Sequence, residues 1–343
     1  MAYDNKRRYI VTGGAGMIGS ALVWALNNRG IDNILIVDRL GDDEKWRNLV
    51  PLQYADYMGA EEFLAATKVA GDALGQVGAI FHMGACSSTT ETDCNYLMKN
   101  NFAYTRDLAQ WASSRRYRFA YASSAATYGD GSEGMSDGSE DLYAYRPLNM
   151  YGYSKHLFDC HAIQKGISRG ILGLKFFNVF GPNEQHKGDM RSVVNKGFHQ
   201  IMETGRLQLF KSYHPDYKHG EQKRDFLYVK DAVEMVLHLA EMPLAGGLFN
   251  IGSGQAATWL ELGQAIFAAL GRPSQIDFVD MPDHLRGKYQ YFTQADMSRF
   301  QATNYPESLT PLQDSVRDYV QNYLLESKHL GDEPWEDDET AEA

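Results

Sequence analysis

Cysteine is scarce in this sequence, and long hydrophobic runs are absent. The 343 residues include three cysteines, Cys86, Cys94 and Cys160, scattered along the chain. Such an odd set favours neither a disulfide framework nor a metal site, so we expect no bound metal and a reducing cytoplasm as the compartment. No apolar run is long enough to span a bilayer, and residues 1–8 lack the apolar core of a signal peptide.

Positive charge is also in deficit. Lysine and arginine number 33 against 44 aspartates and glutamates, so the net charge is −11. This balance argues against nucleic acid or a membrane as a partner, and an anionic substrate would need a local basic pocket. The composition is otherwise that of a globular protein, with 44% apolar and 22% charged residues, and the length suits one large domain or two.

A glycine-rich turn near the N-terminus lies between a predicted strand and a predicted helix. The strand pattern covers residues 9–12, the glycines are Gly13, Gly16 and Gly19, and a helical pattern follows from Ala21. This order predicts a dinucleotide site, in which Gly13 makes the tight turn and Gly16 lets the backbone approach a pyrophosphate. Gly19 permits close packing of the helix on the strand.

The preference between NAD and NADP stays open at the next strand. Residues 33–38 form an apolar strand pattern that ends in Asp38, about 20 residues beyond the glycines. A carboxylate at this point usually binds the adenosine ribose hydroxyls and favours NAD. Arg39 follows at once and Lys45 is close behind, and either cation could hold the 2′-phosphate of NADP.

Two later strand patterns end in small or hydroxyl residues. Residues 77–82 precede the small residues 83–88, against which a flat cofactor could lie, and we expect His82 to be a packed strand residue. The pattern from residue 119 ends at Ser124, where open α/β sheets bind ligands. Ser124 is therefore placed to donate a hydrogen bond to an oxygen that becomes a carbonyl.

Tyr151 and Lys155 follow this strand, four residues apart. On a helix their side chains leave the same face, one turn from each other. Tyrosine has a pKa of about 10, so a phenol that acts as a base at neutral pH needs positive charge nearby. Lys155 together with the positive ring of an oxidised nicotinamide could supply that charge.

The alternation of strands and helices predicts an α/β fold, a doubly wound Rossmann-type parallel sheet with a second, smaller α/β substrate domain. Residues 173–181 read as one strand, and residues 248–252 as a strand that rejoins the first sheet. We therefore expect interleaved domains: a dinucleotide-binding domain of residues 1–179 and 226–253, a substrate domain of 180–225 and 254–327, and an acidic, disordered tail of 328–343.

Four longer motifs indicate more specifically which class of protein this is. They are residues 83–91 (Met-Gly-Ala-Cys-Ser-Ser-Thr-Thr-Glu), 123–129 (Ser-Ser-Ala-Ala-Thr-Tyr-Gly), 186–188 (His-Lys-Gly) and 290–296 (Gln-Tyr-Phe-Thr-Gln-Ala-Asp). With the glycine loop and Tyr-x-x-x-Lys, they resemble the ADP-L-glycero-D-manno-heptose 6-epimerases, which are extended short-chain dehydrogenase/reductases. The resemblance covers nearly the whole chain. It implies tightly held NADP, inversion of C6 of an ADP-linked heptose for lipopolysaccharide core synthesis, and a homo-oligomer, a pentamer in that family.

The resemblance also implies roles for individual residues. Tyr151 and Lys187 would be the two acid/base groups, Ser124 would orient the reacting oxygen, and Lys155 would hold the nicotinamide ribose. The cofactor-lining residues that it implies are Met17, Ile18, Asp38, Arg39, Lys45, Met83, Gly84, Ala85, Cys86, Ser87, Asn100, Lys155, Val179 and Lys187. The substrate-contacting residues that it implies are Asn178, Phe210, Lys211, Ser212, Arg224 and Tyr289.

Several positions depart from the family pattern. Asp189 and Lys196 stand at two substrate-contacting positions where the family usually has a serine and a histidine, and the stretch 213–222 is longer than usual. One basic cofactor contact is missing near Ala60. These departures leave the sugar and the preference for NADP less certain than the type of reaction.

Other functions remain open. A nucleotide-sugar 4,6-dehydratase is disfavoured, because it normally needs a carboxylate pair where this chain has Ala125 and Ala126. A hexose 4-epimerase, or an epimerase-reductase that uses Cys86 and His186, is more credible. A non-catalytic NADP-binding regulator is the third class, and the complete set of Ser, Tyr and Lys argues against it.

Overall fold

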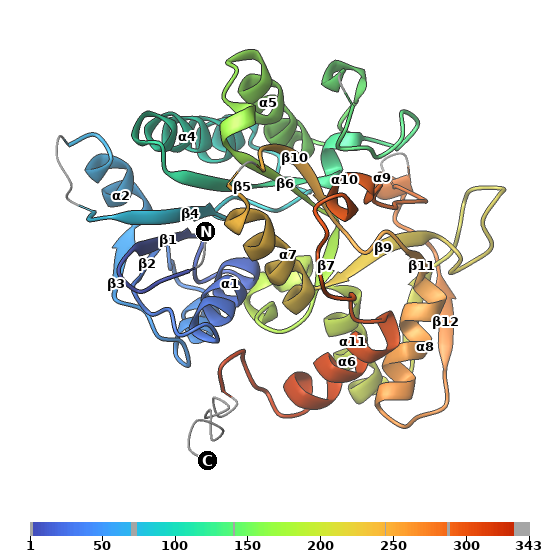
Figure 1. Ribbon diagram of the computed structural model, residues 1–343. Helices are drawn as coiled ribbons and strands as arrows, with labels where there is room; N and C mark the ends of the chain where they lie inside the picture. Colours follow the sequence, from blue (N-terminus) through green and yellow to red (C-terminus); the bar gives the residue numbers. More distant parts are fainter. Residues whose placement is uncertain (1–2, 70–73, 140, 244, 287–288, 333–343) are drawn as a thin grey trace.

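A parallel β-sheet forms the centre of the protein. The computed structural model describes residues 3–69, 74–139, 141–243, 245–286 and 289–332 (Figure 1). Seven strands run parallel in the order β10-β6-β5-β4-β1-β2-β3. Their bounds are β1 (Arg8–Thr12), β2 (Ile34–Asp38), β3 (Asp56–Gly59), β4 (Val77–His82), β5 (Arg118–Ser124), β6 (Leu172–Phe176) and β10 (Gly247–Ile251).

Helices cover both faces of this sheet, which explains why its strands are apolar without alternation. Figure 1 shows α1 (Met17–Asn27) and α7 (Val229–Glu241) on one face, and α4 (Tyr104–Arg115) and α5 (Met150–Gln164) on the other. All five residues of β2 are buried as a result. The predicted doubly wound α/β fold is confirmed. The strand order reverses between β1 and β4, the place where such sheets bind ligands.

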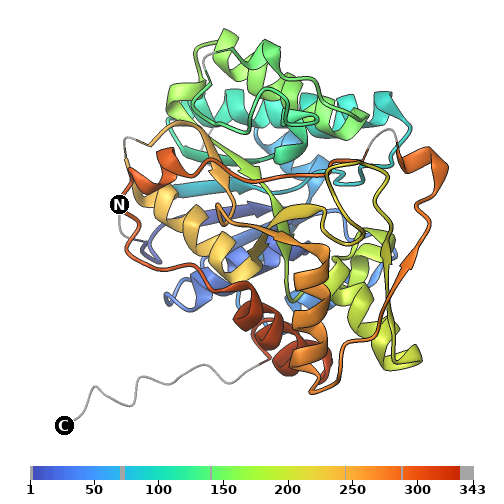
Figure 2. The same ribbon diagram turned by 90° about the vertical axis from the view of Figure 1, so that its right-hand side faces the viewer.

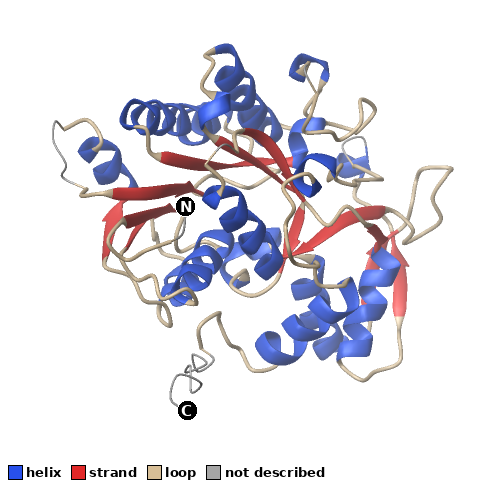
Figure 3. Cartoon of the chain, viewed as in Figure 1, coloured by secondary structure: helices blue, strands red, loops and turns tan. Residues whose placement is uncertain are grey.

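A smaller unit lies beside the main sheet, at the lower right of Figures 1 and 3. Figure 2 shows two of its helices, α8 and α11, side by side. Its strands form a three-stranded sheet, β11-β9-β7, and a two-stranded sheet, β12-β8. The bounds are β7 (Asn178–Phe180), β8 (Leu207–Phe210), β9 (Lys223–Tyr228), β11 (Ala256–Thr258), β12 (Ile276–Val279), α6 (Val193–Thr204), α8 (Trp259–Ala269), α11 (Leu312–Asp318) and the π-helix η7 (Tyr319–Leu324).

Short elements connect these units. Some of them carry residues of the site described below. They are η1 (Glu44–Leu49), α2 (Ala60–Ala66), α3 (Cys94–Leu97), the π-helix η2 (Met98–Ala103), η3 (Ala125–Tyr128), η4 (Leu142–Ala144), η5 (Ser168–Gly170), η6 (Gln185–Met190), α9 (Asp283–Arg286) and α10 (Ser298–Gln301).

The segment predicted as one strand, residues 173–181, is two strands in different sheets. β6 ends at Phe176 in the main sheet, and β7 begins at Asn178 and pairs with β9 in the smaller one. The apolar pattern runs on because Phe176, Phe177 and Phe180 are buried on both sides of the break, so sequence alone did not reveal it. The strand near residue 248, in contrast, pairs with β6 as predicted. The residue ranges given above for the two domains stay a prediction.

The start of the predicted disordered tail is packed. Leu330 is fully buried, and its amide donates to Asn183 Oδ1 at 3.0 Å. The neighbouring His329 Nδ1 lies 2.9 Å from Asn48 Oδ1. The prediction of disorder is therefore wrong for residues 328–332, where one apolar side chain provides enough burial to hold the chain; the rest of the predicted tail, 333–343, lies outside the described residues. Within the described ranges, no helix is both long and apolar enough to cross a membrane.

A buried ion pair joins α5 to the sheet. Lys175 of β6 and Asp159 of α5 are both fully buried, with 2.8 Å between Nζ and Oδ2. The Asp159 carboxylate also accepts hydrogen bonds from Tyr121 at 2.9 Å and Ser123 at 2.8 Å, both on β5. Lys175 donates to Thr127 Oγ1 at 2.6 Å. This network therefore sets α5 against the end of β5.

We predict that Asp159→Asn lowers the free energy of unfolding by about 3–5 kcal/mol, because it leaves the Lys175 ammonium buried without a counter-charge. Denaturant unfolding followed by circular dichroism measures this. Asp314→Asn, which removes a partner of the exposed Arg317, is the control and should change stability little. Equal stability losses in the two variants would contradict the role given to the buried pair.

Candidate active site

A cavity of about 460 Å³ opens at the carboxyl ends of the central strands. It contains every residue predicted to bind cofactor or to act in catalysis. These lining residues are Gly13, Gly16, Met17, Ile18, Gly19, Asp38, Arg39, Lys45, Met83, Gly84, Ala85, Cys86, Ser87, Asn100, Ser124, Tyr151, Lys155, Val179 and Lys187. Local patterns at the ends of β1, β2, β4 and β5 therefore meet in one place, because parallel strands present their carboxyl ends on the same edge of the sheet.

The glycine loop is close-packed as a phosphate-binding turn requires. Gly13 has φ +66°, and a Cβ there would lie 2.6 Å from Gly84 Cα. A Cβ on Gly19 would lie 2.0 Å from the Gly13 carbonyl oxygen, so the helix can approach only with glycine at this position. Gly16 caps α1 without a side-chain hydrogen bond, which leaves the first amides of the helix free to bind a diphosphate.

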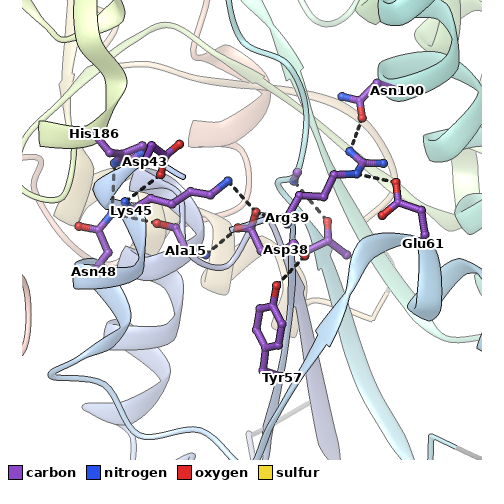
Figure 4. Close-up of polar contacts among 12 residues, drawn as sticks. Ala15, Asp38, Arg39, Asp43, Lys45, Asn48, Tyr57, Glu61, Asn100 and His186 are labelled. Atoms are coloured by element: carbon purple, nitrogen blue, oxygen red, sulfur yellow. Dashed lines mark hydrogen bonds and ion pairs between the residues drawn. The ribbon is translucent and has the colours of Figure 1, made fainter. Parts of the chain in front are cut away.

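Two ion pairs occupy the end of the cavity where the adenosine ribose is predicted to bind (Figure 4). The Asp38 carboxylate accepts from the Ala15 amide at 2.9 Å and from Lys45 Nζ at 3.0 Å. The Arg39 guanidinium donates through Nε to Glu61 at 2.7 Å and through Nη1 to Asn100. Anionic and cationic side chains therefore alternate here, in agreement with the conflicting preferences predicted from the sequence.

Ser124, Tyr151 and Lys155 meet at the other end of the cavity. Burial raises the pKa of the Tyr151 phenol, and the hydrogen bond with Ser124 opposes this only in part. Lys155 Nζ donates to the Ala122 carbonyl at 2.7 Å, and burial lowers the pKa of this ammonium to about 8, although Asp159 opposes that change.

The sequence predicted that Lys155 and an oxidised nicotinamide would together favour the phenolate, and in the protein without that cofactor the pKa of Tyr151 is raised. Burial is the larger effect, and it keeps the phenol protonated. Positive charge from outside the chain, such as an oxidised nicotinamide, would be needed to favour the phenolate.

Lys187 lies on η6 at the mouth of the cavity. Burial lowers the pKa of its ammonium, and the Glu184 carboxylate opposes that shift. Glu184 is fully buried and accepts from Ser192, which caps α6, and from Tyr319 of η7 at 3.1 Å. Burial raises the pKa of Glu184. Lys187, on a segment that connects the two units, thus joins a cavity built mainly by the main sheet. The Glu184 carboxylate, which the sequence did not single out, raises the pKa of its ammonium.

Two asparagines hold the walls of the cavity and were not predicted to do so. Asn101 bonds both the amide and the carbonyl of Cys86 at 2.9 Å and donates to Ser154 at 3.0 Å, so it ties the 83–88 turn to α5. Asn48 donates to the carbonyls of Ala15 and Asn183, so it ties the glycine loop to the segment before Lys187. Asparagine at these positions carries no sequence signal, because its partners are backbone groups far along the chain.

Other lining residues were also not predicted. Several of them form the apolar wall of the cavity, and several are next to predicted residues in the sequence. That proximity in sequence is the only feature from which they could have been predicted. They are Thr12, Val37, Asp43, Tyr96, Tyr104, Ala122, Ser123, Phe176 and Phe177.

Two of the lining residues bear on the alternative epimerase-reductase. Burial raises the pKa of the Cys86 thiol and lowers the pKa of His186 to about 4. Both groups are therefore neutral at pH 7. The predicted packed histidine, His82, is confirmed as such: it lies between Thr12 and Thr105 at 2.6 and 2.8 Å, and burial lowers its pKa to about 3.

The predicted substrate residues do not line this cavity. Arg224 is buried, with its guanidinium 5.0 Å from the centre of the Tyr289 ring and 5.7 Å from that of Trp259. Lys196 Nζ donates to the Asp189 carbonyl at 3.1 Å, and both residues are exposed. The remaining predicted residues are also on the smaller unit or at its edge: Asn178, Phe210, Lys211 and Ser212.

The comparisons with known proteins agree with this geometry. The model of the NAD dependent epimerase/dehydratase family matches residues 9–252. The chain therefore belongs to the NAD dependent epimerase/dehydratase family and is an enzyme that uses a nicotinamide cofactor. Among solved structures, UDP-glucose 4-epimerase of Thermus thermophilus in complex with NAD has a TM-score of 0.71 at 21% identity, and covers 91% of this chain and 97% of its own.

Within that family the chain belongs with the ADP-L-glycero-D-manno-heptose-6-epimerases, as the sequence motifs suggested. The enzyme of that name from Nitratidesulfovibrio vulgaris (strain DP4) is 52% identical over 316 residues, which are 92% of this chain and 98% of the relative. A crystal structure of the Helicobacter pylori enzyme of that name has a TM-score of 0.77 at 24% identity and covers 93% of this chain and 96% of its own.

We predict that Glu184→Gln lowers the pH at which Lys187 becomes neutral, because the carboxylate stabilises the ammonium. The pH dependence of Lys187 modification by an amine-reactive reagent, read by peptide mass spectrometry, measures this. Tyr319→Phe keeps the carboxylate and serves as the control, with a pH dependence like that of the unmodified protein. If the Glu184→Gln curve coincides with that control, Glu184 does not set the charge state of Lys187.

Proposed function

We propose that this enzyme converts ADP-D-glycero-D-manno-heptose into ADP-L-glycero-D-manno-heptose, for lipopolysaccharide core synthesis. The single observation that carries the proposal is the 52% identity to a relative of that name over 98% of its length. The presence of Ser124, Tyr151, Lys155 and Lys187 in one cavity supports it. Inversion proceeds through a transient C6 ketone.

Inversion sets a geometric demand on the protein. A bound nicotinamide dinucleotide would accept the C6 hydride and return it. The hydride must leave one face of the carbon and come back to the other, so the ketone has to turn within the site or the two reactants have to move relative to each other. A turning ketone presents its oxygen in two places, and two proton-handling groups are then useful.

Tyr151 is the first of these groups. Its phenolate takes the proton of the C6 hydroxyl as the hydride leaves, or, in the opposite direction, its phenol gives the proton back. Ser124 shares a hydrogen bond with this phenol and so can orient the same oxygen. Lys155 is fixed one turn away against the Ala122 carbonyl, where it can hold the nicotinamide ribose.

Lys187 is the second group. Its ammonium is partly buried, and burial lowers its pKa, which brings the neutral amine closer to working pH than a solvated lysine. Lys187 enters the cavity from η6, whereas Tyr151 enters it from α5, so Lys187 can address the oxygen in its other position. The substrate loses one proton to one group and gains one from the other, so the two groups end the turnover with exchanged protonation states and are reset by proton exchange with water.

The cofactor proposed is NADP. Lys45 and Arg39 are the two cations at the adenosine end, and both could bond a 2′-phosphate. Asp38 in the same place could bind the ribose hydroxyls of NAD, so NAD is the alternative.

The proposal includes the compartment and the assembly of the protein. We retain the cytoplasm as the compartment, and a homo-oligomer, pentameric by analogy with the family, as the assembly. Cys86, Cys94 and Cys160 are free thiols, which suits a reducing compartment. The substrate domain ranges given above remain the proposed division of the chain.

Proton NMR of ADP-D-glycero-D-manno-heptose mixed with the enzyme is the direct test. We predict that the D- and L-glycero epimers reach a mixture without added cofactor, because the hydride returns to the same molecule. ADP-glucose and UDP-glucose are the controls and should stay unchanged. Conversion of a UDP-hexose at C4, with the heptose untouched, would favour the 4-epimerase alternative.

We predict that Tyr151→Phe and Lys187→Ala each slow inversion by about 10²- to 10⁴-fold, the usual contribution of a positioned acid or base. The adenine nucleotide released by acid, quantified by chromatography, should remain at the level of the unmodified protein. Lys68→Ala is the lysine control, since its side chain is exposed and does not line the cavity. Full activity of Lys187→Ala would remove the second proton-handling group.

A further inference from the structure

A carboxylate beside the cofactor cavity, that of Glu61, bonds the lining residue Arg39 and has a position that neither catalysis nor folding explains. Glu61 lies in the first turn of α2, directly after Ala60, the position that lacks the expected cation. Its carboxylate accepts a hydrogen bond from Arg39 Nε at 2.7 Å, and 73% of its side chain is exposed. Such an exposed ion pair adds little to stability, so another reason for its position is worth seeking.

Arg39 is held in place independently of Glu61. Its Nη1 donates to the buried Asn100, and its guanidinium lies 5.8 Å from the centre of the Tyr104 ring. Figure 4 shows the guanidinium between Asn100 and Glu61. Arg39 lines the cavity, and its contacts with Asn100 and Tyr104 would keep its orientation if Glu61 were replaced.

The second cation at this end is also engaged. Lys45 Nζ is 3.0 Å from Asp38 Oδ1, and the other Asp38 oxygen accepts from the Ala15 amide. Of these two pairs, the Asp38–Lys45 pair is the more buried, with side-chain exposures of 9% and 17%. The Arg39–Glu61 pair is the one that solvent, and an incoming ligand, can exchange most easily.

We propose that Glu61 is a specificity-determining residue for the cofactor: it competes with a 2′-phosphate for Arg39 and so shifts this enzyme towards accepting NAD beside NADP. The inference rests on the nicotinamide cofactor site described above. Glu61 is not one of the residues proposed to contact the reacting atoms.

Charge explains why Glu61 discriminates between the two cofactors. A 2′-phosphate that bonds the Arg39 guanidinium comes within a few ångströms of the Glu61 carboxylate, and like charges at that distance repel. The hydrogen bond from Arg39 lowers the pKa of Glu61, so the carboxylate is ionised at neutral pH. NAD carries a neutral 2′-hydroxyl there, which the Glu61 charge affects little.

The chain carries a matched control. Glu62 has the same charge, is exposed, and follows Glu61 on α2. It does not share a hydrogen bond with Arg39, whose Nε and Nη1 partners are Glu61 and Asn100. A general effect of surface charge on NADP would therefore appear in Glu62→Gln as well, whereas the proposed effect would not.

The experiment measures the affinities of the full-length protein for NADP and NAD, freed of bound nucleotide, by calorimetric titration at low and high salt. We expect Glu61→Gln to raise the preference for NADP over NAD by about two- to fivefold, the range that an exposed ion pair gives. Glu61→Lys should raise it by about tenfold, because it also supplies the cation missing near Ala60. Both gains should shrink at high salt, and Glu62→Gln should leave the preference unchanged.

A second readout uses competition. Each protein is incubated with equal concentrations of NAD and NADP, separated from free nucleotide and denatured, and the released nucleotides are counted. An unchanged ratio in both Glu61 variants, or an equal change in Glu62→Gln, would overturn the inference about Glu61. Absence of both nucleotides from the unmodified protein would instead contradict the cofactor site itself.

Discussion

The buried pair of Asp159 and Lys175 is the contact on which the active-site geometry depends. It joins α5, which carries Tyr151 and Lys155, to β5 and β6, and β5 ends in Ser124. The carboxylate also accepts hydrogen bonds from two β5 side chains, so its position along the strand is fixed from three directions. A shift of α5 by one residue would separate the phenol from the serine, and an unpaired charge in the core opposes such a shift.

The same burial that fixes these groups also decides their charges. Desolvation raises the pKa of Tyr151 and lowers those of Lys155 and Lys187, so each side chain is moved towards its neutral form. In the protein alone, the cavity therefore favours a phenol over a phenolate. A cationic cofactor would reverse that balance for the tyrosine, which makes proton transfer dependent on the presence of the oxidant. Carboxylates outside the cavity, Asp159 and Glu184, limit the shifts of the two lysines.

Much of the fold and one half of the site were predictable from local pattern. The glycine turn, the apolar strands and the Tyr-x-x-x-Lys turn each depend on residues near one another in sequence, and each was found where it was expected. The predicted substrate residues are a different case, since they lie on the smaller unit and none lines the cavity. The apolar run within residues 173–181 concealed a change of sheet at Phe177. Buried phenylalanines lie on both sides of this point, and their sequence pattern does not show to which sheet each strand belongs.

The sequence by itself determined the class of fold and the position of the dinucleotide turn, because strand and helix periodicity and close backbone approach are local properties of the chain. It also supplied the side chains that we propose as catalytic. Only the tertiary structure decided the partners of those side chains. Glu184 beside Lys187, Asn101 on the Cys86 turn, and Glu61 on Arg39 are contacts between segments that sequence order does not bring together. Charge and hydrogen bonding act through space, so the chemical state of each group was set by neighbours that only folding supplied.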